Sequence, residues 1–127
     1  MRKAFICPTK YVQGENEIEN LGYFVQTFGE SALLIAHPDD VARVQAKLDR
    51  TASKFGVKFV TSNFQGECSR PEIERLQKVA AENSCKCTIG LGGGKAIDTA
   101  KCVAAGDNLI IVPTIAATDA PTSHSAV

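Results

Sequence analysis

The sequence GLGGGKAIDTAK, residues 90–101, places three consecutive glycines, Gly92, Gly93 and Gly94, between an apolar run and a predicted helix. Glycine has no Cβ atom, so these residues allow positive φ angles and let backbone N–H groups approach an anion. The helix that follows presents unpaired N–H donors and the positive end of its dipole at the same place. We predict that this turn binds a pyrophosphate, with Lys95 in the first helical turn close to the anion.

The turn does not match the standard phosphate-binding fingerprints. Gly90, Gly92 and Lys95 occupy the three positions of the dinucleotide fingerprint G-x-G-x-x-G, so its last glycine is absent. The P-loop pattern also fails, because Ile89 stands at its first glycine and Ala96 at its Ser/Thr position. The alternative is a turn without a ligand, whose glycines serve only chain reversal and close helix packing. Three glycines in a row favour the anion site.

Apolar strand patterns alternate with amphipathic helix patterns along the chain. Strands are expected at residues 31–37, 57–64, 85–91 and 108–113, and helices at 15–29, 38–56, 69–84 and directly after the glycines. This alternation implies a parallel sheet covered on both faces. We therefore predict an open, Rossmann-like α/β fold, with residues 1–127 forming one domain and ligands binding beyond the carboxyl ends of its strands.

Charge and cysteine content indicate which kinds of partner and which compartment to expect. Lys plus Arg number 14 and Asp plus Glu number 14, with no basic run, so nothing indicates a nucleic-acid or membrane partner. No segment is apolar for long enough to be a signal peptide or a transmembrane helix. The five cysteines are odd in number and irregularly spaced, as expected of reduced thiols in a reducing compartment. We expect a soluble, cytoplasmic protein that binds a small molecule.

Cys85 and Cys87 form a C-x-C pair in a predicted strand, where their side chains point to the same face. Such a pair could bind a metal, but no second Cys or His pair follows at zinc-site spacing. We interpret both as buried structural thiols and expect no metal site in this segment.

A second polar stretch, IIVPTIAATDAPTSHS at residues 110–125, opens from the last apolar strand into a loop rich in hydroxyl groups. Because this loop and the glycine turn both follow strands of one parallel sheet, they should lie at the same sheet edge. There Thr114, Thr118 and Ser123 could donate to a cofactor, and Asp119 could accept from a polyol hydroxyl. The alternative is a polar turn without a ligand.

Together the two stretches resemble the glycerol dehydrogenases of the iron-type alcohol dehydrogenase superfamily. FQGECS at residues 64–69 and PTKYVQGENEIENLG at residues 8–22 extend the likeness over the whole chain. The glycine turn is shared across the superfamily, whereas T-D-A-P-x-S is more particular to the glycerol branch. The resemblance implies an amino-terminal NAD-binding domain here, and a helical carboxy-terminal domain, absent from this chain, that supplies an Asp and two His ligands to a divalent metal, usually zinc.

The activity implied by the resemblance is hydride transfer from glycerol to NAD, which gives dihydroxyacetone. No catalytic residue or metal ligand is expected in this segment, which alone should be inactive, and the longer enzyme is expected to be a homo-oligomer. Carried over by position, the cofactor-binding residues are Gly92, Gly93, Gly94, Lys95, Asp98, Thr114, Thr118 and Ser123, and the substrate-binding residue is Asp119.

The chain departs from the family pattern at three positions. The family often has an Asp just past the first strand of the cofactor domain, where its carboxylate accepts from the adenosine ribose; this chain has His37, followed by Asp39 and Asp40. The choice between NAD and NADP is therefore open, because a His does not repel a 2′-phosphate. Ala117 and Thr122 replace the usual Ser and Cys, and neither removes the backbone cradle.

Other interpretations stay open at this point. A glycerol-1-phosphate dehydrogenase-like enzyme would need extra cationic contacts to the substrate phosphate. A non-catalytic nucleotide-binding module would sense NAD or another phosphate ligand, and a domain without a ligand would use Gly93 only as a turn residue. For Asp98 and Lys101, three apart on one helix, the residues alone favour a solvated ion pair over a role at the cofactor.

Overall fold

The computed structural model describes residues 9–13, 15–64, 66 and 68–113. Its centre is a sheet in the order β1-β5-β4-β2-β3, in which all neighbouring strands are parallel. The strands are β1 (Thr9–Tyr11), β2 (Ser31–Ala36), β3 (Lys58–Asn63), β4 (Cys87–Gly92) and β5 (Leu109–Pro113). The predicted open, parallel α/β fold is confirmed. Strand β1 was not predicted, because its sequence, TKY, has no apolar pattern.

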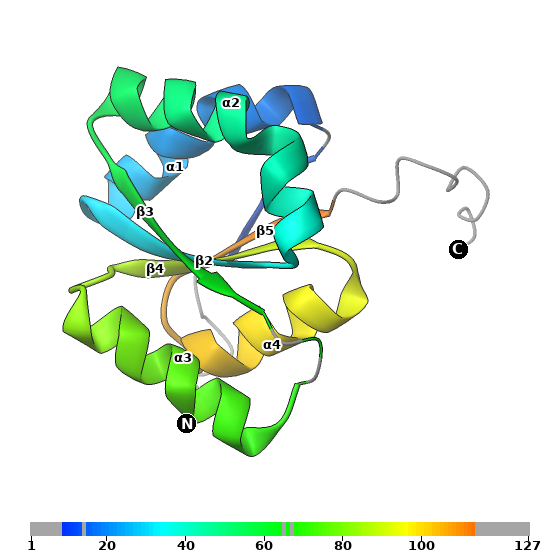
Figure 1. Cartoon of the computed structure of the whole chain (residues 1–127). Helices are drawn as coiled ribbons and strands as arrows, with labels where there is room; N and C mark the ends of the chain where they lie inside the picture. Colours follow the sequence, from blue (N-terminus) through cyan, green and yellow to red (C-terminus); the bar gives the residue numbers. More distant parts are fainter. Residues whose placement is uncertain (1–8, 14, 65, 67, 114–127) are drawn as a thin grey trace.

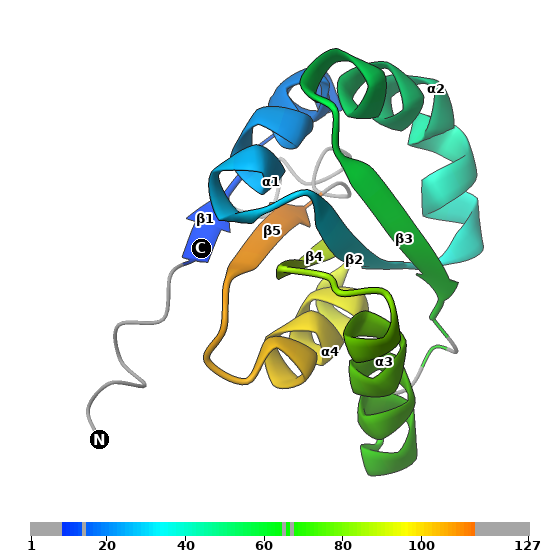
Figure 2. The same cartoon turned by 90° about the vertical axis from the view of Figure 1, so that its left-hand side faces the viewer.

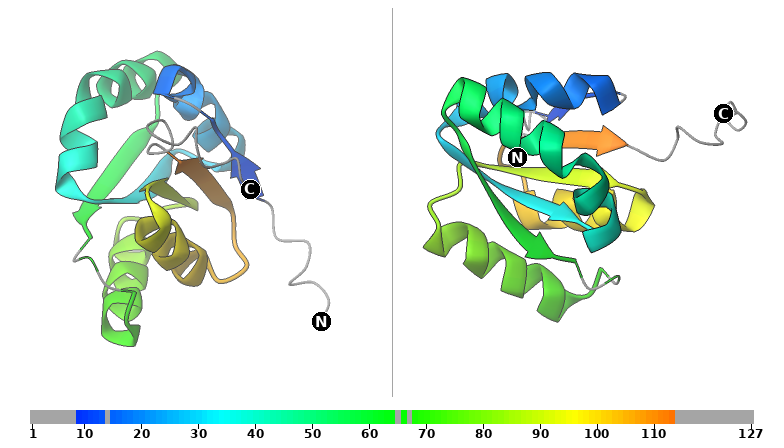
Figure 3. Two further views of the ribbon diagram at one scale, coloured as in Figure 1. Left: turned by 90° about the vertical axis from the view of Figure 1, so that its right-hand side faces the viewer. Right: turned by 45° about the horizontal axis from the view of Figure 1, so that its top comes forward.

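Helices cover both faces of the sheet (Figure 1), and Figures 2 and 3 show this layering from other directions. One face carries the 3₁₀ helix η2 (Glu15–Asn20), α1 (Leu21–Phe28) and α2 (Pro38–Phe55), and the other carries α3 (Arg70–Glu82) and α4 (Gly94–Ala104). The predicted helix at 15–29 is thus split in two. The break lies beside Gly22, whose N–H donates to Thr51 Oγ1 of α2 at 2.8 Å. None of the helices described here is long and apolar enough to cross a membrane.

Strand β2 separates two hydrophobic cores. Ala32, Leu34 and Ala36 pack against α1 and α2, while Leu33 and Ile35 pack against α3 and α4. All five side chains are fully buried. Burial on both faces explains why SALLIA is a continuous apolar run, as is typical of a central parallel strand. Each buried Leu or Ile contributes roughly 1.5–3 kcal/mol relative to an exposed position.

The order of the strands places a crevice at the carboxyl edge of the sheet. From β2 the chain passes through α2 to β3, and then returns through α3 to β4 on the other side of β2. Helix α2 therefore leaves the end of β2 toward one face, while α4 leaves the end of β4 toward the other (Figure 1). In α/β sheets such a divergence opens a crevice beyond the strand ends, where ligands bind.

Candidate functional site

The glycine turn lies at this crevice, between β4 and α4. Gly92 ends β4 with a φ of 124°, a backbone conformation that residues with a Cβ rarely adopt. Gly93 is the N-cap of α4 and is extended, with φ −94° and ψ −171°. Lys95 follows in the first turn of the helix with its side chain exposed. The positive φ of Gly92 thus turns the chain so that α4 begins beyond the strand end.

Close packing accounts for one glycine near the turn. A Cβ atom at Gly90 would lie 2.7 Å from Ala100 Cβ and 3.2 Å from Ile97 Cα. The first distance is shorter than side-chain packing allows and the second is tight, so the missing side chain lets α4 lie directly on β4. This is the packing role that the ligand-free alternative assigns to the glycines.

Neither close packing nor a positive φ explains the glycines at Gly93 and Gly94. A Cβ atom at either position would meet nothing within 4 Å. Neither residue has a positive φ, in contrast to Gly92. The space above them is open at the start of a helix, and it is wide enough for an anion to approach the backbone. The two glycines therefore fit a phosphate cradle better than a turn built only for packing.

The start of α4 also lacks the capping found on α2 and α3. His37 Nδ1 accepts from Asp39 N at 3.1 Å at the start of α2. Ser69 Oγ accepts from Glu72 N at 3.4 Å at the start of α3. The N-cap of α4, Gly93, makes no side-chain cap, and no acidic residue stands in the first turn. Since the first N–H groups of a helix have no intrahelical partner, α4 presents donors and positive partial charge to the crevice.

Asp40 is a site residue whose position the sequence did not predict. Its Oδ2 would lie 2.7 Å from a Cβ atom at Gly92, so this carboxylate lies against the glycine turn. Its Oδ1 accepts from Arg43 Nη1 at 3.0 Å. Its place in the first turn after β2 was a usable signal, because that turn follows a strand that ends at the ligand-binding edge. His37, which stands where the family often has a carboxylate, instead caps α2.

The structure brings the predicted residues Gly92, Gly93, Gly94, Lys95 and Asp98 together at the start of α4. No ion pair joins Asp98 to Lys101 in the part of the chain that the structure describes, so the simple pairing favoured by sequence is wrong. Both side chains are exposed on a helix, where solvent competes with such pairs.

The second predicted loop follows β5 at the same edge. In the pairing of β4 with β5, Gly92 lies beside Pro113, the last residue of β5. The chain therefore leaves β5 next to the glycine turn. The loop residues predicted for cofactor and substrate lie outside the described residues, so their roles remain predictions: Thr114, Thr118, Asp119 and Ser123.

Comparison with known proteins decides the family. The family model for iron-containing alcohol dehydrogenases matches residues 8–127. The chain belongs to this family. It is 37% identical to the glycerol dehydrogenase of Pseudomonas putida and 37% identical to the glycolaldehyde reductase of Halobacterium salinarum, in both cases over 100% of this chain and 35% of the relative. The resemblance identified from the sequence is thereby confirmed.

A solved structure gives the same result. The probable glycerol dehydrogenase from Sinorhizobium meliloti 1021 matches with a TM-score of 0.71 and 37% identity, over 90% of this chain and 30% of that one. The chain thus spans 35% of the length of the curated relatives named above. The family and the Rossmann-like fold are shown over nearly the whole chain.

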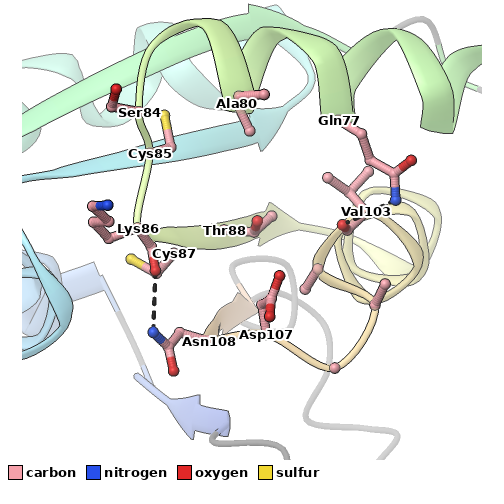
Figure 4. Close-up of a pocket in the computed structure, with 14 residues that line it drawn as sticks. Gln77, Ala80, Ser84, Cys85, Lys86, Cys87, Thr88, Val103, Asp107 and Asn108 are labelled. Carbon is pink, nitrogen blue, oxygen red and sulfur yellow. Dashed lines mark hydrogen bonds between the residues drawn. The ribbon is translucent and has the colours of Figure 1, made fainter.

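The chain also has a hollow of about 590 Å³ at the opposite end of the strands, between the carboxyl ends of α3 and α4 (Figure 4). Thr88 and Asp107 line it, and Asn108 Nδ2 donates to the Lys86 carbonyl at 3.1 Å. The carboxyl ends of helices carry partial negative charge, which disfavours a pyrophosphate. The hollow is therefore a less suitable place for a dinucleotide than the start of α4.

The prediction of a buried structural thiol is confirmed for Cys87, but Cys85 is half-buried and lies before β4. The expected common face is wrong, because Cys87 belongs to the core under α1 and α2, whereas Cys85 packs against the core under α3 and α4. Cys87 is 3% exposed, and burial raises the pKa of its thiol to about 12. Burial also raises the pKa of the half-buried Cys85. Both thiols are therefore protonated at neutral pH, which makes them poor metal ligands and poor nucleophiles.

The family is named for iron, and a bound metal ion would need several ligand side chains close together. Within residues 9–13, 15–64, 66 and 68–113, no group of three or more His, Cys, Asp or Glu side chains is placed to hold a metal ion. Structural and catalytic metal sites require at least three protein ligands at short distance. The described residues therefore do not fit a metal centre.

Proposed function

We propose that residues 1–127 form the dinucleotide-binding domain of a glycerol dehydrogenase, which transfers hydride from glycerol to NAD and yields dihydroxyacetone. The observation that carries the proposal is the open, uncapped helix start at Gly93 and Gly94, in the crevice where α2 and α4 diverge. The 37% identity to a glycerol dehydrogenase supports the substrate class. The proposal includes a helical metal-binding domain that this chain does not contain.

In this proposal the backbone does most of the binding. The N–H groups at Gly93 and Gly94 donate to the pyrophosphate, and the dipole of α4 favours its negative charge. The exposed Lys95 adds a positive charge at the same helix turn. Bound NAD supplies the acceptor for the hydride. The remaining proposed contacts are Asp98, Thr114, Thr118 and Ser123 to the dinucleotide and Asp119 to the polyol.

Glycine replacement tests the cradle. Gly93→Val adds a side chain to an extended backbone that valine adopts readily, so the chain still folds. The side chain fills the space of the phosphate, and we expect NAD affinity to fall by about a hundredfold or more, since lost hydrogen bonds to a charged group cost roughly 1.5–3 kcal/mol each. Isothermal titration calorimetry with NAD measures the loss.

Ala46→Val is the matched control. Ala46 is exposed on α2, so this variant adds the two methyl groups of valine away from the crevice and should bind NAD like the unmodified protein. Absence of binding by the unmodified protein at millimolar NAD, or equal affinity in Gly93→Val, would contradict the proposal.

We further propose that the enzyme prefers NAD to NADP. The carboxylate of Asp40, which lies against the glycine turn, would repel a 2′-phosphate. Asp40→Ala removes this charge and the ion pair that Asp40 makes with Arg43 at 3.0 Å. We expect the ratio of NADP to NAD affinity to rise about tenfold, the effect of one charge interaction of ~1.4 kcal/mol. A ratio unchanged in parallel titrations would show that Asp40 does not select the cofactor.

A second candidate substrate is glycolaldehyde. The glycolaldehyde reductase of Halobacterium salinarum is also 37% identical over the whole chain, and its name indicates a small hydroxyaldehyde as substrate. Comparing kcat/KM of the complete enzyme for glycerol with NAD and for glycolaldehyde with NADH separates the two. A higher value for glycolaldehyde would reverse the order proposed here. The relatives reported above favour neither a glycerol-1-phosphate enzyme nor a non-catalytic module.

Zinc as the metal, a homo-oligomeric assembly and a cytoplasmic location belong to the same proposal. Elemental analysis of the complete, purified enzyme tests the first, with one zinc per subunit as the expected result. Bound iron, the metal in the family's description, would replace zinc in the proposal. Sedimentation of the same sample tests the assembly state.

A further inference from the structure

The hollow between the carboxyl ends of α3 and α4 contains a buried hydroxyl group that the described chain does not satisfy. Thr88 lies on β4 between Leu33 of β2 and Leu109 of β5, and it is 6% exposed. Its N–H donates to the Asn108 carbonyl at 3.0 Å, but its hydroxyl makes no hydrogen bond within the residues that the structure describes. The side chain points into the space between the two helices (Figure 4). Since a buried polar group without a partner is unfavourable, this hydroxyl indicates a polar ligand.

The ends of two helices make the hollow electrostatically negative. Helix α3 ends at Glu82 and α4 ends at Ala104, and residues 80–81 and 103–106 near these ends line the hollow. The last carbonyl groups of a helix carry partial negative charge. The Asp107 carboxylate lines the same space and adds a full negative charge. The hollow therefore favours a positively charged ligand.

The cationic side chain nearest to the hollow is directed elsewhere. Lys86 is the one cationic residue among the described residues that line the hollow. Its side chain lies against Gly29, where an added Cβ atom would meet Lys86 Cβ at 2.6 Å. Figure 4 shows its ammonium group turned away from Thr88. A positive charge in the hollow therefore has to come from outside the described chain.

The hydrogen-bonding groups of the hollow select the kind of cation. Gln77 Nε2 donates to the Val103 carbonyl at 3.3 Å, and Asn108 Nδ2 donates to the Lys86 carbonyl at 3.1 Å, so both amide donors already have acceptors. The Thr88 hydroxyl and Gln77 Oε1 can accept from a ligand. An ammonium group matches them, because it carries N–H donors and no acceptor. A metal ion does not, since the described residues provide no group of three ligand side chains.

We propose that the hollow binds a short primary alkylammonium compound. Its ammonium group donates to the Thr88 hydroxyl, and its carbon chain lies over the small side chains of Ala80 on α3 and Ala104 on α4, which line the hollow. The volume of about 590 Å³ leaves room for both parts of such a ligand. The site lies at the end of the strands opposite to the start of α4, so the inference does not depend on the proposed dehydrogenase activity.

Titration of the purified protein with n-butylammonium chloride tests the site. We expect isothermal titration calorimetry to show saturable binding in the millimolar range. n-Butanol has the same carbon chain without the charge, and tetramethylammonium has the charge without N–H donors. Each should bind at least about tenfold more weakly than n-butylammonium, because each lacks one half of the proposed recognition.

Replacement of Thr88 shows whether binding occurs in the hollow. Thr88→Val removes the hydroxyl and keeps the shape of the side chain between Leu33 and Leu109. We expect n-butylammonium affinity to fall about tenfold, as for one hydrogen bond to a charged group, while the midpoint of urea denaturation stays equal or rises. Thr61→Val, at an exposed position of β3, is the matched control and should keep the affinity of the unmodified protein.

Three results would overturn the inference. One is the absence of saturable n-butylammonium binding, and another is equal affinity in Thr88→Val and the unmodified protein. The third is equal affinity for n-butanol and n-butylammonium, which would make the hollow an apolar site. Circular dichroism shows whether each variant is folded. Ala80→Leu, which fills the hollow from α3, should abolish binding and gives a second test if Thr88→Val does not fold.

Discussion

The amino termini of α3 and α4 are capped differently, although both helices pack on the same face of the sheet. Helix α3 satisfies its own start, because Ser69 caps it and the buried Glu72 adds a negative charge that Arg75 binds with bonds of 2.9 and 2.8 Å. Helix α4 has a glycine at the same place and no acid in its first turn. An N-cap of Ser or Asp stabilises a helix by about 1 kcal/mol relative to alanine.

The difference shows that the chain forgoes a stabilising N-cap at the start of α4. Like α3, helix α2 has a side-chain cap and an acidic first turn. Among these three helices α4 is therefore the exception. Its start lies at the divergence of α2 and α4, where α/β sheets bind ligands. Without a side-chain cap, the first N–H groups of α4 can bind an external anion. At the start of α3, the chain's own side chains take that place.

Converting the start of α4 into that of α3 should have the largest effect. Gly93→Asp places a carboxylate where it can accept the first N–H groups of the helix, and the extended backbone of Gly93 suits an Asp N-cap. We expect NAD affinity to fall by more than about a hundredfold, or ~2.7 kcal/mol, through repulsion and loss of donors. The free energy of unfolding should stay equal or rise slightly.

Calorimetry with NAD and urea denaturation measure the two quantities on the same samples. A variant that is destabilised and also loses NAD would leave the cause ambiguous, so Gly93→Asn serves as a neutral cap of the same shape. It should be as stable as Gly93→Asp but lose less affinity. Equal affinities of both variants and the unmodified protein would break the comparison.

The second largest effect is expected for Gly92→Ala, which tests the turn rather than the cap. Alanine at a φ of 124° is strained, and its Cβ would meet Asp40 Oδ2 at 2.7 Å. We expect a loss of roughly 1–3 kcal/mol in the free energy of unfolding. Adding Asp40→Ala removes the close contact but leaves the strained backbone, so the double variant should recover only part of the loss. Full recovery in urea denaturation would show that φ is not limiting.

At the start of α3 the opposite result is expected. Ser69→Ala removes the hydroxyl that caps Glu72 N at 3.4 Å and should lower the free energy of unfolding by about 1 kcal/mol. NAD affinity should not change, because this helix start is not proposed to bind the cofactor. Ser53→Ala, at an exposed position of α2, is the matched control and should change neither quantity. A loss of NAD affinity in Ser69→Ala would remove the functional distinction between the helices.

The fold was predictable from local patterns wherever one pattern covered a whole element. The apolar run at 31–37 predicted a buried strand, and the helical pattern at 69–84 predicted α3, which begins at Arg70. Prediction failed where contacts between distant parts of the chain determine the element. Strand β1 has only its pairing with β5 to define it, and the helix break beside Gly22 depends on a hydrogen bond to Thr51 in α2.

The site was predictable to a similar degree. The glycine turn was found because its signal is contiguous in sequence, and its division into a packing glycine at Gly90 and open ones at Gly93 and Gly94 required coordinates. The place of Asp40 in the first turn after β2 was a usable signal, but its contact with Gly92 could not be predicted, because that contact exists only where β2 and β4 are neighbours.

The smallest expected effect is at Lys95, and there stability and binding should change in opposite directions. A cation near a helix amino terminus is unfavourable, so Lys95→Ala should raise the free energy of unfolding by about 0.3–1 kcal/mol. The same change removes a positive charge from the proposed phosphate site and should weaken NAD binding a few-fold, more at low salt than at high salt. Lys101→Ala, in the last turn of the same helix, is the control: it should lower stability and leave NAD affinity unchanged. If Lys95→Ala weakened neither binding nor its salt dependence, the start of α4 would attract the anion through its backbone alone.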